Sequence, residues 1–136
     1  RSKISGPLLD RIDIQIEVPR VEYKDLVVKT KGEVSSQIRK RVNKARKIQE
    51  ARLKKTEIFS NARMHNRHLK VFCKLDAQCE KILEQAVDVL GFSARACHSA
   101  IRVGRTIADL ENAPEIERHH LAEAIGFRSF DRKITQ

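Results

Sequence analysis

An amphipathic segment that follows Ser93 constrains the fold of this chain more than any other part of the sequence. Its apolar residues recur at helical spacing and predict a helix that packs one stripe against a core. Serine is a favoured N-cap, so we expect the helix to begin after Ser93 and to end near Pro114. The stripe comprises Ala100, Ile101, Val103, Ile107, Ala108 and Leu110. Other elements must cover it.

Arg95 stands in the first turn of that helix, where a cation is unfavourable. The positive end of the helix dipole lies there, and an exposed cation costs about 0.3–1 kcal/mol. A bound anion explains an arginine at this position. Phosphate is the obvious candidate, because guanidinium matches it in geometry and charge. We therefore predict that Arg95 contacts a phosphate group.

Four further segments show helical spacing and predict a small helical bundle. A long helix is expected from about residue 35 to residue 55, and shorter helices over 65–73 and 118–125. A fourth is expected between Asp76, a favoured N-cap residue, and Gly91, a favoured stop. The chain is therefore predicted to be mainly α.

One stretch near the N-terminus alternates apolar and polar residues as a half-buried strand does. Its apolar members are Ile12, Ile14, Ile16 and Val18, and Pro19 ends the pattern. A single strand is not stable alone, and residues 71–136 contain no second convincing strand. Two interpretations follow. The strand is the orphan edge of a missing domain, which we favour, or it forms a weak hairpin with residues 26–28.

Basic residues are concentrated in the first half of the chain. The net charge is +10, with +11 in residues 1–70 and −1 in residues 71–136. This excess favours a polyanion such as nucleic acid, with an acidic protein surface as the alternative. The long helix carries nine Lys or Arg between Arg39 and Lys55, for which a solvated charged face is the commoner explanation. Its candidate nucleic-acid contacts are Arg39, Lys40, Lys44 and Lys47.

The cysteines and histidines indicate neither disulfides nor a metal site. The three cysteines form no even framework and no CxxC pair, so we expect reduced thiols and a cytoplasmic protein. His65 and His68 lie three residues apart, and His119 and His120 are adjacent, but no third ligand has diagnostic spacing. We therefore expect no metal. The sequence also contains no membrane-spanning run and no secretory signal.

Two stretches together resemble a known family of ATPases. They are KISGPLLDRIDIQIEVPRV at residues 3–21 and FSARACHSAIRVGRTIADLENAPEIERHHLAEAIGFRSFDR at residues 92–132. In this order and at this spacing they are similar to the C-terminal third of the magnesium-chelatase-like AAA+ ATPases of the ComM type. The resemblance implies that residues 1–33, with one strand and a connector, end the α/β ATPase core. Residues 34–136 would then form its helical lid.

The same resemblance implies roles for two arginines. Arg11, in the LLDR motif, matches the arginine finger that reaches into the ATP site of the neighbouring subunit. Arg95, in the SAR motif, matches the sensor-2 arginine that contacts the γ-phosphate of its own subunit's ATP. From composition alone, the alternative is that Arg11 has no role in catalysis and is a surface arginine paired with Asp10 or Asp13.

Three further positions of the arginine-bearing helix bear on this assignment. Arg105 lies about 15 Å beyond the sensor-2 position, so we expect it to pair with Asp109 four residues on. Ser99 stands where the family usually has a basic residue, and Gly104 where it usually has alanine. The glycine costs the helix up to about 1 kcal/mol. Neither of these two differences from the family pattern changes Arg11 or Arg95.

The sequence lacks the parts of an ATPase that hold nucleotide and metal. It contains no GxxxxGK[ST] loop and no apolar strand that ends in paired acids. The chain alone is therefore expected to be inactive and to bind neither ATP nor Mg²⁺, which belong to the full-length protein. A finger that acts in trans requires a ring. The resemblance implies a hexameric homo-oligomer, joined to an upstream ATPase core and coupled to DNA branch migration, with no membrane partner.

Other functions stay open on the sequence alone. The alternatives are a free-standing basic helical module that binds nucleic acid, a structural bundle that binds another protein, and a motor subunit that inserts metal into a porphyrin. The sequence specifies neither the substrate of the motor nor the size of the ring.

Overall fold

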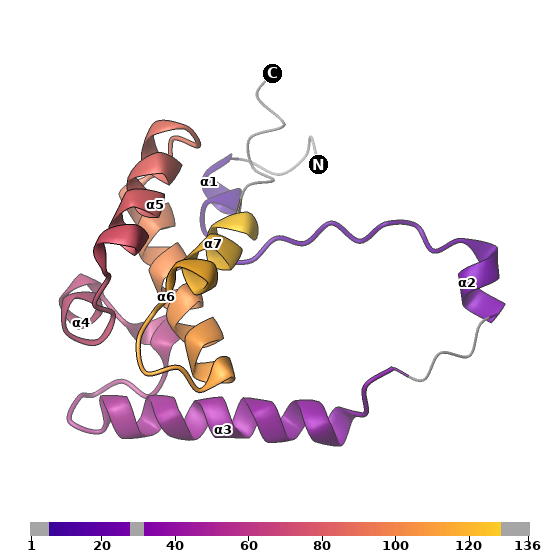
Figure 1. Ribbon diagram of the computed structural model, residues 1–136, viewed down its shortest axis with the longest axis horizontal. Coiled ribbons are helices and arrows are strands. Elements are labelled where there is room, and N and C mark those ends of the chain that lie inside the picture. The colour runs from indigo at the N-terminus through magenta and orange to yellow at the C-terminus, as the bar shows by residue number, and fades with distance from the viewer. Residues whose placement is uncertain (1–5, 28–31, 129–136) are drawn as a thin grey trace.

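The computed structural model describes residues 6–27 and 32–128, and these residues form helices and connecting loops (Figure 1). In chain order the elements are α1 (Gly6–Leu9), α2 (Tyr23–Val27), α3 (Ser35–Leu53), the 3₁₀ turn η1 (Asn61–Arg63), α4 (Asn66–Phe72), α5 (Ala77–Asp88), α6 (Ala94–Glu111) and α7 (Arg118–Gly126). No strand occurs in this part of the chain, so the prediction of a mainly α fold is confirmed. None of its helices combines the length and the apolar character needed to cross a membrane.

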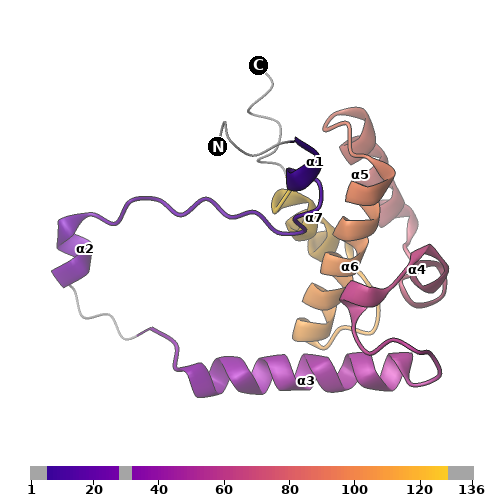
Figure 2. The same ribbon diagram turned by 180° about the vertical axis from the view of Figure 1, so that it is seen from behind.

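Helix α6 is the centre of the bundle. Helix α7 packs along it most extensively, and α3, α4 and η1 also contact it, while α5 lies against α7 (Figures 1 and 2). The core between these helices includes Leu53, Met64, Leu69, Cys73, Cys79, Phe92, Ala96, Ala100, Ile116, Leu121 and Ile125. The three cysteines are free thiols, two of them buried, as the sequence predicts.

Both predicted N-caps are confirmed. Ser93 Oγ accepts a hydrogen bond from the Ala96 amide at 3.1 Å, and Asp76 Oδ1 accepts one from the Cys79 amide at 2.8 Å. Each cap satisfies an amide that has no partner inside its own helix. The Ser93 cap therefore places Arg95 in the first turn of α6.

The observed helix bounds agree closely with the predicted ones. Helix α3 ends at Leu53, two residues before the expected end, and α5 ends at Asp88, before Gly91. The predicted stripe of α6 is buried at Ala108, but Leu110 is 44% exposed. The sequence does not predict α1 and α2, because each is a single short turn that buries no residue.

Residues 12–18, predicted as a strand, form no strand in the described part of the chain. Their apolar side chains are exposed, Val18 to 81%, and they pair with no strand among the residues that the structure describes. A strand needs a second strand to complete its backbone hydrogen bonds. The alternative hairpin is not formed either, because Leu26 and Val27 lie in α2, and Val28 is outside the described residues.

The described residues that follow α1, up to the end of α2 at Val27, instead form an arm that leaves the bundle (Figures 1 and 2). Helix α2 lies at its far end. Ile16, Val18 and Tyr23 on this arm are 68%, 81% and 81% exposed. That much exposed apolar surface is typical of a segment that another part of a protein covers. The orphan edge of a sheet therefore stays a prediction.

Candidate functional site

Helix α6 carries three arginines whose surroundings differ. Arg105 is 1% exposed and donates to the carbonyl oxygens of Ala113 and Pro114. Arg102 donates to the carbonyl oxygen of Met64 at 3.3 Å. Arg95, the second residue of the helix, is exposed, and its side chain has no hydrogen bond or ion pair within the described part of the chain. An incoming anion would meet an unpaired guanidinium beside the positive end of α6.

Arg11 lies in the turn that follows α1, and it is also exposed. Its side chain has no partner among residues 6–27 and 32–128. The neighbouring carboxylates bind other groups: Asp10 pairs with Arg128, and Asp13 accepts from the Ser99 hydroxyl. The interpretation of Arg11 as the partner of one of these two acids is therefore wrong.

Arg11 and Arg95 lie at the same end of the bundle. Oγ of Ser93, the N-cap residue of α6, lies 3.4 Å from Oδ1 of Asp10, and Asp10 directly precedes Arg11 in the chain. A pocket of about 260 Å³ lies between the two segments. Its lining residues are Gly6, Leu9, Asp10, Gly91, Phe92, Ser93, Ala96 and Arg128.

Arg128 is a functional candidate that sequence reasoning missed. It follows the C-terminal end of α7 and is only 2% exposed. Its guanidinium donates to the carbonyl oxygens of Ile12 at 2.8 Å and of Asp10 at 3.1 Å. An arginine beside a helix end is usually exposed. No local signal could have revealed its burial, because the bond joins residues more than a hundred positions apart.

A buried polar cluster lies toward the other end of α6. The predicted pair of Arg105 with Asp109 is confirmed, with an N–O distance of 3.2 Å. Asp109 also accepts hydrogen bonds from Arg52 of α3 and Asn61 of η1. Arg52 therefore does not belong to the solvated face of the long helix. The cluster joins α3 and η1 to α6.

The four candidate nucleic-acid contacts lie on the exposed surface of α3. Arg39, Lys40, Lys44 and Lys47 are all exposed, and none has a side-chain partner in the described residues. The buried residues of α3 all come from its C-terminal half, beginning at Ala45. The helix therefore presents an unneutralised basic surface.

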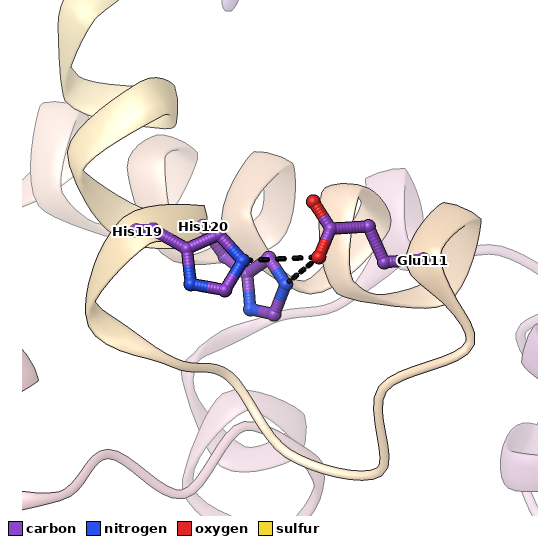
Figure 3. Close-up of side chains that lie close together, drawn as sticks. All are labelled: Glu111, His119 and His120. Atoms are coloured by element: carbon purple, nitrogen blue, oxygen red, sulfur yellow. Dashed lines mark hydrogen bonds and ion pairs between the residues drawn. The ribbon is translucent and has the colours of Figure 1, made fainter.

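Glu111, His119 and His120 form a cluster that the spacing of the histidines does not predict (Figure 3). The Nε2 atoms of His119 and His120 lie 3.0 and 2.9 Å from Oε2 of Glu111. Hydrogen bonds from the two histidines lower the pKa of Glu111, and the bond to Glu111 raises the pKa of His119. The ligand types and their proximity would suit a divalent metal.

The hydrogen bonds of His120 argue against a metal in this cluster. Its Nδ1 accepts a hydrogen bond from the Glu117 amide at 2.9 Å, so a neutral His120 carries its proton on Nε2. A metal at Nε2 needs the lone pair of that nitrogen, with the proton on Nδ1. The cluster is better described as a set of hydrogen bonds that joins the end of α6 to the start of α7.

Two family models match the chain. The one described as magnesium chelatase, subunit ChlI C-terminal, covers residues 32–128, and the one described as magnesium chelatase, subunit ChlI, covers residues 1–26. The chain belongs to the magnesium chelatase ChlI family. Membership agrees with the resemblance carried by the motifs around Arg11 and Arg95.

Individual relatives show which type of magnesium-chelatase-like protein this chain is similar to. Competence protein ComM of Haemophilus influenzae is 41% identical over 98% of this chain. The uncharacterized proteins YifB of Salmonella typhimurium and Escherichia coli are 39% and 37% identical over the same share. The chain is thus a ComM-type magnesium-chelatase-like sequence. It spans 26% of the length of each of these relatives.

Proposed function

We propose that this chain is the C-terminal part of an AAA+ ATPase of the ComM type and that it supplies two arginines to ATP hydrolysis. Arg11 acts in trans as the arginine finger of the neighbouring subunit's site. Arg95 acts as sensor 2 on the γ-phosphate of its own subunit's ATP. The observation that supports this proposal is that both side chains are exposed and unpaired among the described residues, at one end of the bundle.

Both guanidiniums would stabilise the charge that develops as the γ-phosphate leaves. ATP and Mg²⁺ are held by an ATPase core whose phosphate loop this sequence does not contain. Because each subunit completes its neighbour's site, the working unit is a ring, which we propose to be a hexamer in the cytoplasm. Without that core, residues 1–136 have no hydrolytic activity.

The role of Arg95 is tested in the full-length protein. Arg95→Ala is expected to lower ATP turnover roughly tenfold or more, because the transition state loses a positive charge at the γ-phosphate. Thermal stability should not change, since no described side chain is paired with Arg95. Arg67→Ala is the matched control: Arg67 is the second residue of α4 as Arg95 is of α6, and it is exposed as well. Wild-type turnover in the Arg95 variant would end the proposal.

The role of Arg11 is tested by mixing subunits. Arg11→Ala rings are expected to be inactive. Some turnover should return when they are mixed with subunits that keep Arg11 but carry an inactivated phosphate loop, because the finger acts across the interface. If no mixing ratio restores activity, Arg11 does not act in trans.

We propose further that the ring remodels DNA and that α3 contacts the nucleic acid. The supporting observation is the unneutralised basic surface of α3, and one relative is named a competence protein. A full-length variant in which Arg39, Lys40, Lys44 and Lys47 are replaced by Gln should bind duplex DNA more weakly. The slope of log K against log salt should fall by about 0.9 for each phosphate that the variant no longer neutralises.

A second variant separates a specific DNA surface from net charge. It removes the same number of charges from exposed residues elsewhere, namely Lys70, Lys74, Lys81 and Arg118. This control should leave the salt slope nearly unchanged. Equal slopes in both variants would exclude α3 as the DNA-binding element. No binding of DNA by the wild-type protein would favour the alternative of a metal-insertion motor.

A further inference from the structure

Arg128 holds the backbone on both sides of Arg11. One terminal nitrogen donates to the carbonyl oxygen of Ile12 at 2.8 Å, and the other donates to that of Asp10 at 3.1 Å. The second nitrogen also lies 3.2 Å from Oδ1 of Asp10. A planar guanidinium can serve these acceptors at once, because its donors form a rigid fork. The Arg11 backbone therefore cannot shift without breaking bonds on both sides.

The same guanidinium connects this turn to α6. It lies 3.3 Å from Oγ of Ser99, a fully buried residue one helical turn after Arg95. The Ser99 hydroxyl in turn donates to the carboxylate of Asp13. One hydrogen-bonded cluster around the buried Arg128 thus joins the turn that carries Arg11, the helix that carries Arg95, and the end of α7.

We propose that Arg128 is a positioning residue that holds Arg11 in place relative to α6, so that the finger meets the neighbouring subunit's γ-phosphate. This inference rests on the proposed function. The position of the exposed Arg11 side chain depends on the position of its backbone. A catalytic group that is misplaced by about 1 Å can cost about a hundredfold in rate. Arg128 is buried and acts through Arg11, so its loss should affect turnover while leaving ATP binding in its own subunit unchanged.

The test is Arg128→Lys in the full-length protein. Lysine keeps the charge, but its single ammonium cannot bridge both carbonyl oxygens in the way that the fork does. We expect kcat to fall roughly tenfold or more, with KM for ATP within about twofold of wild type. Mixing with subunits that keep Arg11 and Arg128 but carry an inactivated phosphate loop should restore turnover. Loss of ATP affinity in place of kcat would overturn the inference.

Arg105→Lys is the matched control for a merely structural role. Arg105 is equally buried, and it also binds two backbone carbonyl oxygens and a carboxylate, but it lies away from Arg11. Its variant should lose stability as Arg128→Lys does and keep kcat within about twofold. An equal loss of kcat in both variants would show that lowered stability, not positioning, is the cause.

A double variant and a milder variant complete the experiment. Arg11→Ala with Arg128→Lys should be no slower than Arg11→Ala alone, because both changes disable one function. Ser99→Ala removes the hydrogen bonds of Ser99 with Arg128 and Asp13 and keeps the guanidinium. This variant serves if Arg128→Lys rings fail to assemble. It should lower kcat, and wild-type kcat in an assembled Ser99→Ala ring overturns the inference.

The outcomes for Arg11 and Arg128 separate the two proposals. Full activity of Arg11→Ala refutes the proposed function itself. An inactive Arg11→Ala with normal kcat in Arg128→Lys refutes only the positioning role.

Discussion

At the scale of single residues, Gly104 marks a position in α6 where a larger side chain would fit. Gly104 is buried opposite Leu121 of α7. A methyl group built there would meet the Leu121 side chain at 3.5 Å and its backbone at 3.6 Å, which are ordinary van der Waals distances. The glycine is therefore not required by close packing, and its cost to the helix is not offset.

Gly104→Ala is accordingly expected to stabilise the protein by about 0.5–1 kcal/mol, because alanine loses less backbone entropy in a helix. Urea denaturation should show a higher midpoint with an unchanged slope. Gly126→Ala is a useful comparison, since Gly126 is the last residue of α7 and has nothing within 4 Å of a new methyl group. A lower midpoint for Gly104→Ala would mean that Leu121 leaves no room for the methyl group.

Asp109→Ala should have the opposite effect and a larger one. Its carboxylate has no exposed surface, and its removal leaves Arg105 buried without a counter-charge. Loss of one partner from a buried pair costs about 3–5 kcal/mol. Asp88→Ala, at the exposed end of α5, serves as the control and should change the unfolding free energy little. A cost below about 1 kcal/mol for Asp109→Ala would show that Asn61 and solvent replace the carboxylate.

At the scale of elements, the start of α5 depends on the ionised form of Asp76. The hydrogen bond from the Cys79 amide lowers the pKa of this carboxyl below its ordinary value of 3.8. The folded state thus holds the proton less tightly than the unfolded state does. The stabilisation is present above the ordinary pKa and is lost as the pH falls through the lowered pKa of the folded state.

Asp76→Ala should therefore lower Tm at pH 7 and lose that difference in strong acid. Asp76→Asn keeps an oxygen that can accept from the Cys79 amide, so its Tm at pH 7 should lie between those of the other two proteins. Thermal unfolding followed by circular dichroism from about pH 2 to pH 7 measures both effects. An acid-independent deficit in Asp76→Ala would mean that lost packing, not the cap, is responsible.

The helices of the bundle could be predicted from the sequence because their signals are local. Ser93 and Asp76 cap the helices that follow them, and the apolar spacing of α3 through α7 has a period that only a helix satisfies. The strand over residues 12–18 has an equally clear period, but a strand is completed by another strand. Local pattern could not show whether that partner is present.

At the scale of the whole molecule, the exposed arm should be the first part to be cut by a protease. Arg20 and Lys24 lie on this arm and are exposed, with no buried neighbour on α2. Brief trypsin treatment of the chain should release fragments that end at these residues before Lys81, which is held within α5, is cut. Mass spectrometry identifies the cuts. Early cleavage after Lys81 would show that the bundle opens as readily as the arm.

The candidate site was predictable only where motifs carry it. Arg11 and Arg95 stand in recognisable motifs, and Arg105 has its acid four residues away. Arg128 and Arg52 could not be assigned from the sequence, because their partners are 116 and 57 positions distant. The same holds for Glu111, which a loop brings to His119 and His120. Distant pairings of this kind follow from the fold and not from any local pattern.

The bond between Arg52 and Asp109 has a mechanical consequence. Helix α6 has 18 residues and is about 27 Å long, with Arg95 near its start and Asp109 near its end. Tilting such a rod by about 10° at its first turn swings its far end through about 5 Å. Since Asp109 at the far end is hydrogen-bonded to Arg52 of α3, such a tilt would carry the basic helix with it.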